Sequence, residues 1–171
     1  TDKTVNQVTE SLFQKYPDAA SYAGAVPEEL ERDIHRCGYY RAKAAHIIGA
    51  CEKICSCFGG EVPDTMEELI LLPGVGRKTA NVVLSNLYNV PCIAVDTHVE
   101  RVSKRLKIAR KLDSVLEVEK KLMKMIPQEL WSRSHHQLVL FGRYICKARG
   151  PECSNCAFYD DCTSKDKKKR N

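Results

Sequence analysis

Four features are missing from this 171-residue sequence, and each absence narrows what the protein can be. No stretch approaches the ~20 consecutive apolar residues of a membrane-spanning helix, and no secretory signal peptide is visible. No segment keeps up the two-residue alternation that is typical of a half-buried strand, and no internal repeat is evident. These absences predict a soluble, almost wholly helical protein with no membrane partner.

The composition suits a folded protein with an anionic partner. Hydrophobic residues make up 43% of the chain, which is enough for a core in one domain or in two small lobes. The net charge of +5 and the pI of about 8.7 are compatible with a polyanion. The cysteines number nine, and four of them cluster near the C-terminus. Without a secretory signal, this pattern favours reduced thiols and a metal site over a disulfide framework.

Apolar residues at helical spacing, bounded by proline, glycine and capping residues, predict a series of helices. The predicted helices cover residues 2–16, 18–24, 27–37, 41–58, 64–71, 76–88, 96–109, 113–126 and 128–146. We expect Asp64, Asp96 and Asp113 to be N-cap residues. The tail from Lys165 to Arg170, basic except at Asp166, is expected to be disordered.

The most informative stretch runs from Leu71 to Asp96 and reads LLPGVGRKTANVVLSNLYNVPCIAVD. Gly74 and Gly76 allow a tight turn, and a helix that starts directly after such a turn suits an anion. The helix dipole disfavours an ammonium in the first turn. Lys78 is therefore expected to favour the free amine, the form that a nucleophile needs. The glycine spacing fits neither a Walker A loop nor a dinucleotide fingerprint. An ordinary glycine-rich connection explains LPGVG alone equally well, but the RKTAN continuation favours a functional site.

Four cysteines form the second constellation, with the spacing C-x6-C-x2-C-x5-C from Cys146 through Cys153 and Cys156 to Cys162. Four thiolates so close in sequence are suitable ligands for a [4Fe–4S] cluster or for tetrahedral zinc. The spacing alone does not choose between the two. Zinc ribbons usually pair two CxxC knuckles, and only one is present here.

LPGVGRKTANVVL followed by AVDTHVERV resembles the helix-hairpin-helix DNA glycosylases, and among them most the endonuclease III family. The resemblance runs from Thr1 to about Cys162. It implies an all-α, two-lobed fold in which residues 1–91 form a helical lobe with the hairpin, and residues 92–171 form a lobe with a [4Fe–4S] cluster loop and a basic tail. In that family a further apolar helix precedes the position that corresponds to Thr1. We therefore expect the first lobe to lack that helix.

The resemblance also implies an activity, namely base excision repair by a bifunctional DNA glycosylase and abasic-site lyase. Lys78 would attack C1′ of an oxidised pyrimidine nucleotide, and Asp96 would stabilise positive charge on the sugar and assist proton transfers. β-Elimination from the resulting Schiff base would then nick the strand 3′ to the abasic site. The related adenine glycosylases lack this lysine, and the 8-oxoguanine glycosylases lack the cysteine loop, so oxidised pyrimidines are the favoured substrates.

Binding residues are implied in the same way. The partner would be double-stranded DNA with a damaged base or an abasic site, bound by a monomer inside the cell, in the cytoplasm or nucleoid. Tyr39 would act as a wedge in the duplex, and a monovalent cation at the hairpin is possible by analogy with the family. The residues expected to contact DNA are Gly74, Val75, Gly76, Arg77, Thr79, Tyr39, Lys147 and Arg149. The four cysteines would hold the [4Fe–4S] cluster.

Weaker signals leave alternatives open. Arg101, Lys104, Arg105 and Lys107 form either a basic face for DNA or a solvated surface, with a slight preference for DNA. The pair His135-His136 is expected to make hydrogen bonds in the core and not to bind metal. The alternatives to the favoured function are a glycosylase for another lesion and a non-catalytic DNA-binding module.

Overall fold

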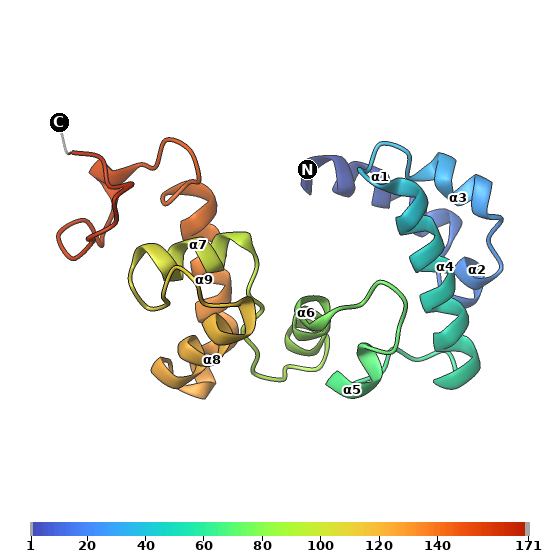
Figure 1. Cartoon of the computed structure of the whole chain (residues 1–171). Coiled ribbons are helices and arrows are strands. Elements are labelled where there is room, and N and C mark those ends of the chain that lie inside the picture. The colour runs from blue at the N-terminus through green and yellow to red at the C-terminus, as the bar shows by residue number, and fades with distance from the viewer. Residues whose placement is uncertain (1, 170–171) are drawn as a thin grey trace. The chain divides into compact units, whose positions relative to one another are not determined.

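A computed structural model describes residues 2–169 of the chain, and all of its regular elements are helices (Figure 1). They are α1 (Asp2–Lys15), α2 (Ala19–Ala23), α3 (Pro27–Asp33), α4 (Tyr40–Cys57), α5 (Met66–Leu69), α6 (Arg77–Leu87), α7 (Thr97–Arg105), α8 (Val115–Met125), the 3-10 helix η1 (Gln128–Leu130), α9 (Trp131–Tyr144) and the 3-10 helix η2 (Cys153–Asn155). No strand occurs among the described residues, which confirms the predicted all-α fold. Within residues 2–169, no helix combines the length and apolar character needed to cross a membrane.

The chain divides into two compact units, Thr1–Gly76 and Arg77–Asn171. This boundary lies before α6, whereas the sequence analysis placed the lobe boundary after residue 91. The difference has a physical reason, because α6 is bonded to the segments that follow it. Asn81 Nδ2 donates to the Ile93 carbonyl at 3.4 Å, and Ser85 Oγ donates to Ser132 Oγ at 2.8 Å.

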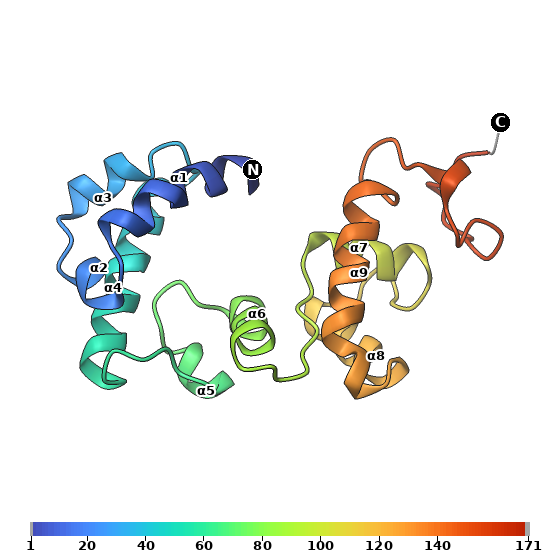
Figure 2. The same ribbon diagram turned by 180° about the vertical axis from the view of Figure 1, so that it is seen from behind.

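The first unit is organised around α4, along which α2 and α3 pack (Figure 2). Val8 and Leu12 of α1 are four residues apart, so they lie on one face of the helix and enter the same core. Leu30 is fully buried there, and burial of a side chain of this size contributes about 2 kcal/mol. The buried cluster consists of Val8, Leu12, Tyr16, Leu30, Ile34 and Ala44.

The second unit has a separate core between α7, α8 and the segment that precedes α7. The cluster consists of Ile93, Val95, Val99, Ala109, Val118 and Leu122. Helix α9 runs close beside α7, and Gly142 permits this approach. A Cβ atom on Gly142 would lie 2.9 Å from Cβ of His98, so a larger residue would push the two helices apart.

Side-chain caps set the starts of several helices. Asp96 caps α7 as predicted. The predictions for Asp64 and Asp113 are wrong by one residue, because Thr65 caps α5 and Ser114 caps α8. Ser114 also forms a capping box with the glutamate three residues later, and this pairing outcompetes the neighbouring aspartate for the cap position.

Candidate active site

The hairpin turn connects α5 to α6 and needs glycine at one position for two reasons. Gly74 has a φ of +75°, a conformation that L-residues with side chains rarely adopt. A Cβ atom there would also lie 2.8 Å from Cβ of His46 on α4. The turn is closed by a hydrogen bond from Val75 N–H to the Leu72 carbonyl at 3.1 Å, and Gly76 precedes the first residue of α6. The glycine-rich turn is therefore exposed, tightly packed against α4, and followed at once by a helix start.

Lys78 lies in the first turn of α6 and is exposed, as is the adjacent Thr79. N–H groups in the first turn of a helix have no partner within the helix, so this end of α6 can accept an anion. An exposed lysine beside such a site is accessible to a reactant bound there.

Asp96 occupies the N-cap of α7 and is only partly exposed. Its Oδ1 accepts hydrogen bonds from the backbone N–H groups of His98 at 2.9 Å and Val99 at 2.8 Å. Both bonds use the same oxygen, so Oδ2 is not needed for the cap. The carboxylate is thus held in one orientation by its own helix, as a residue that acts on a neighbouring reactant must be.

His135 on α9 links the two predicted catalytic residues electrostatically. Burial lowers the pKa of His135, and the neighbouring His136 lowers it further. Asp96 raises the pKa of His135 and Lys78 lowers it, so all three side chains belong to one electrostatic environment. The imidazole is also hydrogen-bonded to the Ala94 carbonyl, while its Nδ1 is buried without a hydrogen-bond partner among the described residues. The hydrogen bond of half-buried His135 agrees with the predicted role, whereas His136 is exposed, so the prediction of a core position is wrong for His136.

Arg77 has a partner that the sequence analysis did not identify. Its guanidinium binds the carboxylate of Glu119 on α8 through two nitrogens, with Nη2 to Oε1 at 2.6 Å and Nε to Oε1 at 3.1 Å. Asn81 Nδ2 donates to Oε2 of the same carboxylate at 3.4 Å. The bond to Glu119 raises the pKa of Arg77. A signal for Glu119 does exist in the sequence, since it shares the apolar helical stripe of Val118 and Leu122.

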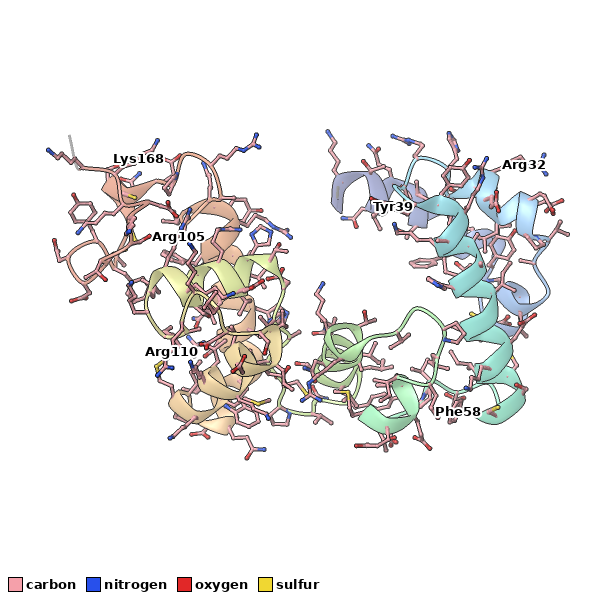
Figure 3. The ribbon with its side chains drawn as sticks, in the orientation of Figure 1. Arg32, Tyr39, Phe58, Arg105, Arg110 and Lys168 are labelled. Carbon is pink, nitrogen blue, oxygen red and sulfur yellow. The ribbon has the colours of Figure 1, made fainter. Side chains whose placement is uncertain are left out.

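Tyr39 stands at the turn before α4 and is 90% exposed (Figure 3). Its φ of 57° is in the left-handed region, which is uncommon for a bulky residue. Lys43 Nζ donates to the Gly38 carbonyl and lies 5.8 Å from the centre of the Tyr39 ring. Strained residues of this kind often mark functional sites, and here the turn projects an aromatic ring into solvent.

The four C-terminal cysteines all line one apolar cavity, together with Phe141, Ile145 and Tyr159. Burial raises the pKa of the Cys156 thiol, the Phe158 backbone N–H lowers it, and the other three thiols raise it. Within residues 2–169, no three His, Cys, Asp or Glu side chains already have the spacing of a metal site. The donor set nevertheless fits a thiolate-bound group, because ligation and the final ordering of such a loop occur together.

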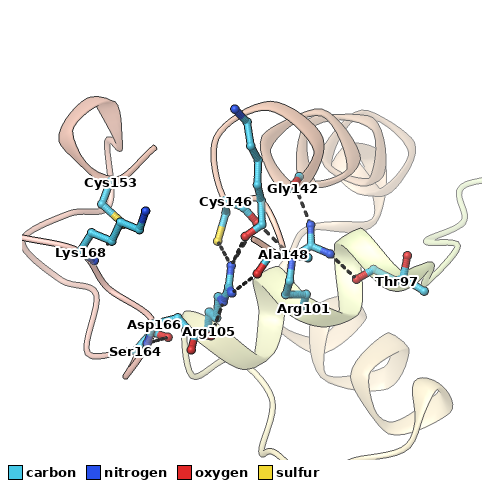
Figure 4. A network of polar contacts seen from close by, with 11 residues as sticks. Thr97, Arg101, Arg105, Gly142, Cys146, Ala148, Cys153, Ser164, Asp166 and Lys168 are labelled. Atoms are coloured by element: carbon cyan, nitrogen blue, oxygen red, sulfur yellow. Dashed lines mark hydrogen bonds and ion pairs between the residues drawn. The ribbon is translucent and has the colours of Figure 1, made fainter. Parts of the chain in front are cut away.

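Arginine and backbone donors bond to two of these cysteines, Cys146 and Cys153, and to their neighbours (Figure 4). Arg105 Nη1 donates to Cys146 Sγ at 3.5 Å and to the Lys147 carbonyl at 2.6 Å. The backbone N–H of Lys168 donates to Cys153 Sγ at 3.3 Å. Arg105 also pairs with Asp166 at 2.9 Å. The prediction of a disordered tail is therefore wrong as far as Lys169, while Arg170 lies outside the described residues.

Two residues of the expected basic face turn toward the cysteine loop instead of toward solvent. Arg101 donates to the carbonyls of Gly142 at 2.7 Å and Cys146 at 3.0 Å, and the side chain of Arg105 is only 11% exposed. Lys107 is exposed and fits the surface interpretation. On the loop itself, Arg149 is exposed and Lys147 pairs with Glu152 at 2.8 Å.

Comparisons with known proteins agree with this geometry. A family model described as HhH-GPD superfamily base excision DNA repair protein matches residues 1–128. Endonuclease III of Bacillus subtilis is 56% identical over 162 residues, which cover 95% of this chain and 74% of that protein. Endonuclease III of Synechocystis is 47% identical over 165 residues, covering 96% of this chain and 75% of that protein.

Solved structures are similar to this chain in the same way as the sequences of its relatives. A trapped covalent intermediate of endonuclease III with DNA superposes with a TM-score of 0.93 at 55% identity, covering 95% of this chain and 76% of that one. A thermostable thymine-DNA glycosylase has a TM-score of 0.81 at 22% identity, and this likeness concerns the fold alone.

Proposed function

The chain belongs to the endonuclease III family within the HhH-GPD superfamily of base excision DNA repair proteins, and from this premise we propose that Lys78 and Asp96 carry out its chemistry. The protein is a DNA glycosylase and abasic-site lyase that acts on oxidised pyrimidines in double-stranded DNA. The observation that carries the assignment of residues is geometric: Lys78 is exposed in the first turn of α6 after the glycine-rich turn, and Asp96 is held by its own helix cap through one oxygen alone.

The proposed reaction begins with the free amine of Lys78. Its lone pair forms a bond to C1′ while the C1′–N bond breaks, and the damaged base leaves with that electron pair and takes up a proton. Opening of the sugar ring, with loss of the amine protons and protonation of O4′, gives a Schiff base. Removal of a C2′ proton then expels the 3′ phosphate, and water releases the lysine. Asp96 stabilises the positive charge on the sugar and serves the proton transfers.

DNA binding is assigned to three exposed elements of the two units. The turn Gly74–Gly76 with Thr79 offers backbone N–H groups to a phosphate, and a contact of this kind fixes position without reading sequence. A monovalent cation at this turn remains a prediction from family resemblance. Tyr39 enters the duplex as a wedge, which lowers the cost of extruding the damaged nucleotide. Arg149 and Lys147 add contacts to phosphates from the cysteine loop.

The cysteine cavity is assigned to a [4Fe–4S] cluster held by Cys146, Cys153, Cys156 and Cys162. Endonuclease III proteins typically carry such a cluster, and the thiols that line one apolar cavity support the assignment here. When bound, the cluster supplies four metal–thiolate bonds that order the loop. The ordered loop would in turn hold Lys147 and Arg149, which lie on it, in place.

Borohydride trapping on a duplex with one abasic site tests the catalytic assignment. Reduction of the Schiff base ties the enzyme covalently to DNA, so the wild type should form an adduct and Lys78→Ala should form none. Lys120→Ala is the matched control, since Lys120 is an exposed lysine on α8. If Lys78→Ala traps as well as the wild type, the assignment of the nucleophile is wrong. If the wild type binds the duplex without trapping, the chain acts as a DNA-binding module.

A further inference from the structure

One buried carboxylate binds the helix that carries Lys78, and a shared partner links it to the segment that leads to Asp96. Glu119 binds Arg77, the neighbour of Lys78 in the first turn of α6, and also Asn81 one turn later. We infer that Glu119 is a positioning residue, which fixes the first turn of α6 relative to the segment that leads to Asp96. The inference rests on the proposed function, because it concerns the geometry of the same reaction.

The spacing in the RKTAN motif explains how one carboxylate reaches both partners. Arg77 and Asn81 are four residues apart, so they share a face of α6, whereas Lys78 lies about 100° further round the helix. The face with Arg77 and Asn81 turns toward α8. There the carboxylate of Glu119 accepts hydrogen bonds from Nε and Nη2 of Arg77 and from Nδ2 of Asn81. Lys78 is thereby left exposed on the adjacent face.

The same network reaches the Asp96 segment. Asn81 Nδ2 donates to the Ile93 carbonyl at 3.4 Å as well as to Glu119. Ile93 is fully buried, and Val95, directly before Asp96, is 4% exposed. A displacement of Asn81 would therefore move both the start of α6 and the chain that enters the Asp96 cap.

Glu119 and Asn81 are the buried part of this network, whereas the side chain of Arg77 is 51% exposed. The side chain of Glu119 is 3% exposed, and Asn81 is also buried. Glu119 lies three residues before Leu122, which is fully buried, so the two side chains share an inward face of α8. A buried carboxylate must be paired and hydrogen-bonded, and here Arg77 and Asn81 meet that need together. Burial raises the pKa of Cys92, next to Ile93, Glu119 raises it further, and Arg77 lowers it.

The consequence for the reaction is geometric. A misplacement of about 1 Å can reduce a rate by a factor of about 100 even when the reacting groups are intact. Removal of Glu119 should therefore slow the step in which Lys78 attacks, although Glu119 touches no reactant. A role in stability alone would lower the melting temperature and leave the rate of the folded protein unchanged.

The test uses single-turnover borohydride trapping at saturating abasic duplex, well below the melting temperature of each variant. Glu119→Ala should trap at least about 10-fold more slowly than the wild type. Glu117→Ala is the matched control, since it disrupts the capping box of the same helix, and within residues 2–169 the hydrogen bonds of Glu117 go to Ser114 and not to α6. That control should melt earlier yet trap at the wild-type rate.

The double variant R77M/E119L separates position from stability. Apolar side chains of similar volume often restore the stability that a broken buried ion pair loses. We expect the melting temperature of R77M/E119L to recover while the trapping rate stays low, because the bonds to Asn81 and the start of α6 are gone. If the rate recovers with the melting temperature, or if Glu119→Ala traps at the wild-type rate, the inference is overturned. A wild type that fails to trap would instead refute the proposed function.

Discussion

The Lys78–Asp96 region and the cysteine loop, residues 146–162, are held in place by different means. Between Lys78 and Asp96, the chain is fixed by its own groups, with Ile93 fully buried and Asp96 locked into a helix cap. In the cysteine loop no residue is buried, and the contacts that hold it come largely from Arg105 and the tail. From this difference we expect the polypeptide alone to hold the catalytic segment, and the proposed cluster to order the cysteine loop.

The largest expected effect comes from removing one cysteine. Cys156→Ser should lose the cluster, because the three thiols that remain in the cavity cannot complete a set of four ligands. The loss should be seen as missing bound iron and missing iron–sulfur absorbance. Limited proteolysis should then cut within residues 147–169. Residues 77–96 should stay protected, because buried side chains such as Ala80, Leu84 and Ile93 hold them. Equal cleavage in both regions would contradict the difference between them.

A second experiment separates the two roles of Asp96. Asn can accept the same cap hydrogen bonds as Asp but carries no charge, so Asp96→Asn should keep the melting temperature and lose about 100-fold in single-turnover rate. Asp96→Ala should lose activity and also about 1 kcal/mol of stability through the missing cap. If Asp96→Asn retained full activity, the carboxylate would act only as a cap.

The sequence predicts the local part of this structure well. Helical periodicity and the proline and glycine breaks located the helices, and Asp96 was correctly expected at the start of α7. The caps at Thr65 and Ser114 were missed by one residue, because adjacent capping residues compete and the choice depends on side-chain geometry.

Partners distant in sequence were much harder to predict. Arg77 was expected to contact DNA, and its bond to Glu119 joins residues 42 positions apart. Arg101 and Arg105 similarly bind carbonyls of α9 and the cysteine loop, and nothing in their local spacing indicates this. Position along a helix gives the face that a residue occupies, but the element packed against that face follows only from the tertiary fold.

A third prediction concerns how the protein itself holds the cysteine loop. Arg105→Met removes a guanidinium that donates to the carbonyls of Cys146 and Lys147. The loss of donors to partly buried carbonyls should cost about 1–3 kcal/mol of local stability, seen as faster proteolysis of residues 147–169. Lys107→Met is the matched control, as Lys107 is an exposed cation near the end of the same helix. Equal protection of both variants would show that Arg105 does not hold the loop.

The smallest expected effect is a pH dependence that arises in the catalytic region. Burial and His136 lower the pKa of His135 below its ordinary value of 6.5, and Lys78 lowers it further, against the opposing effect of Asp96. Below about pH 6.5 the unfolded chain binds a proton that the folded protein resists, so the unfolding free energy should fall as the pH drops below that value. Denaturant unfolding between pH 5 and pH 8 should show this slope in the wild type and a flatter curve in His135→Asn. His35→Asn, which replaces an exposed imidazole in the other unit, should keep the slope. An unchanged slope in His135→Asn would mean that another group titrates, and that His135 does not report on the environment shared by Lys78 and Asp96.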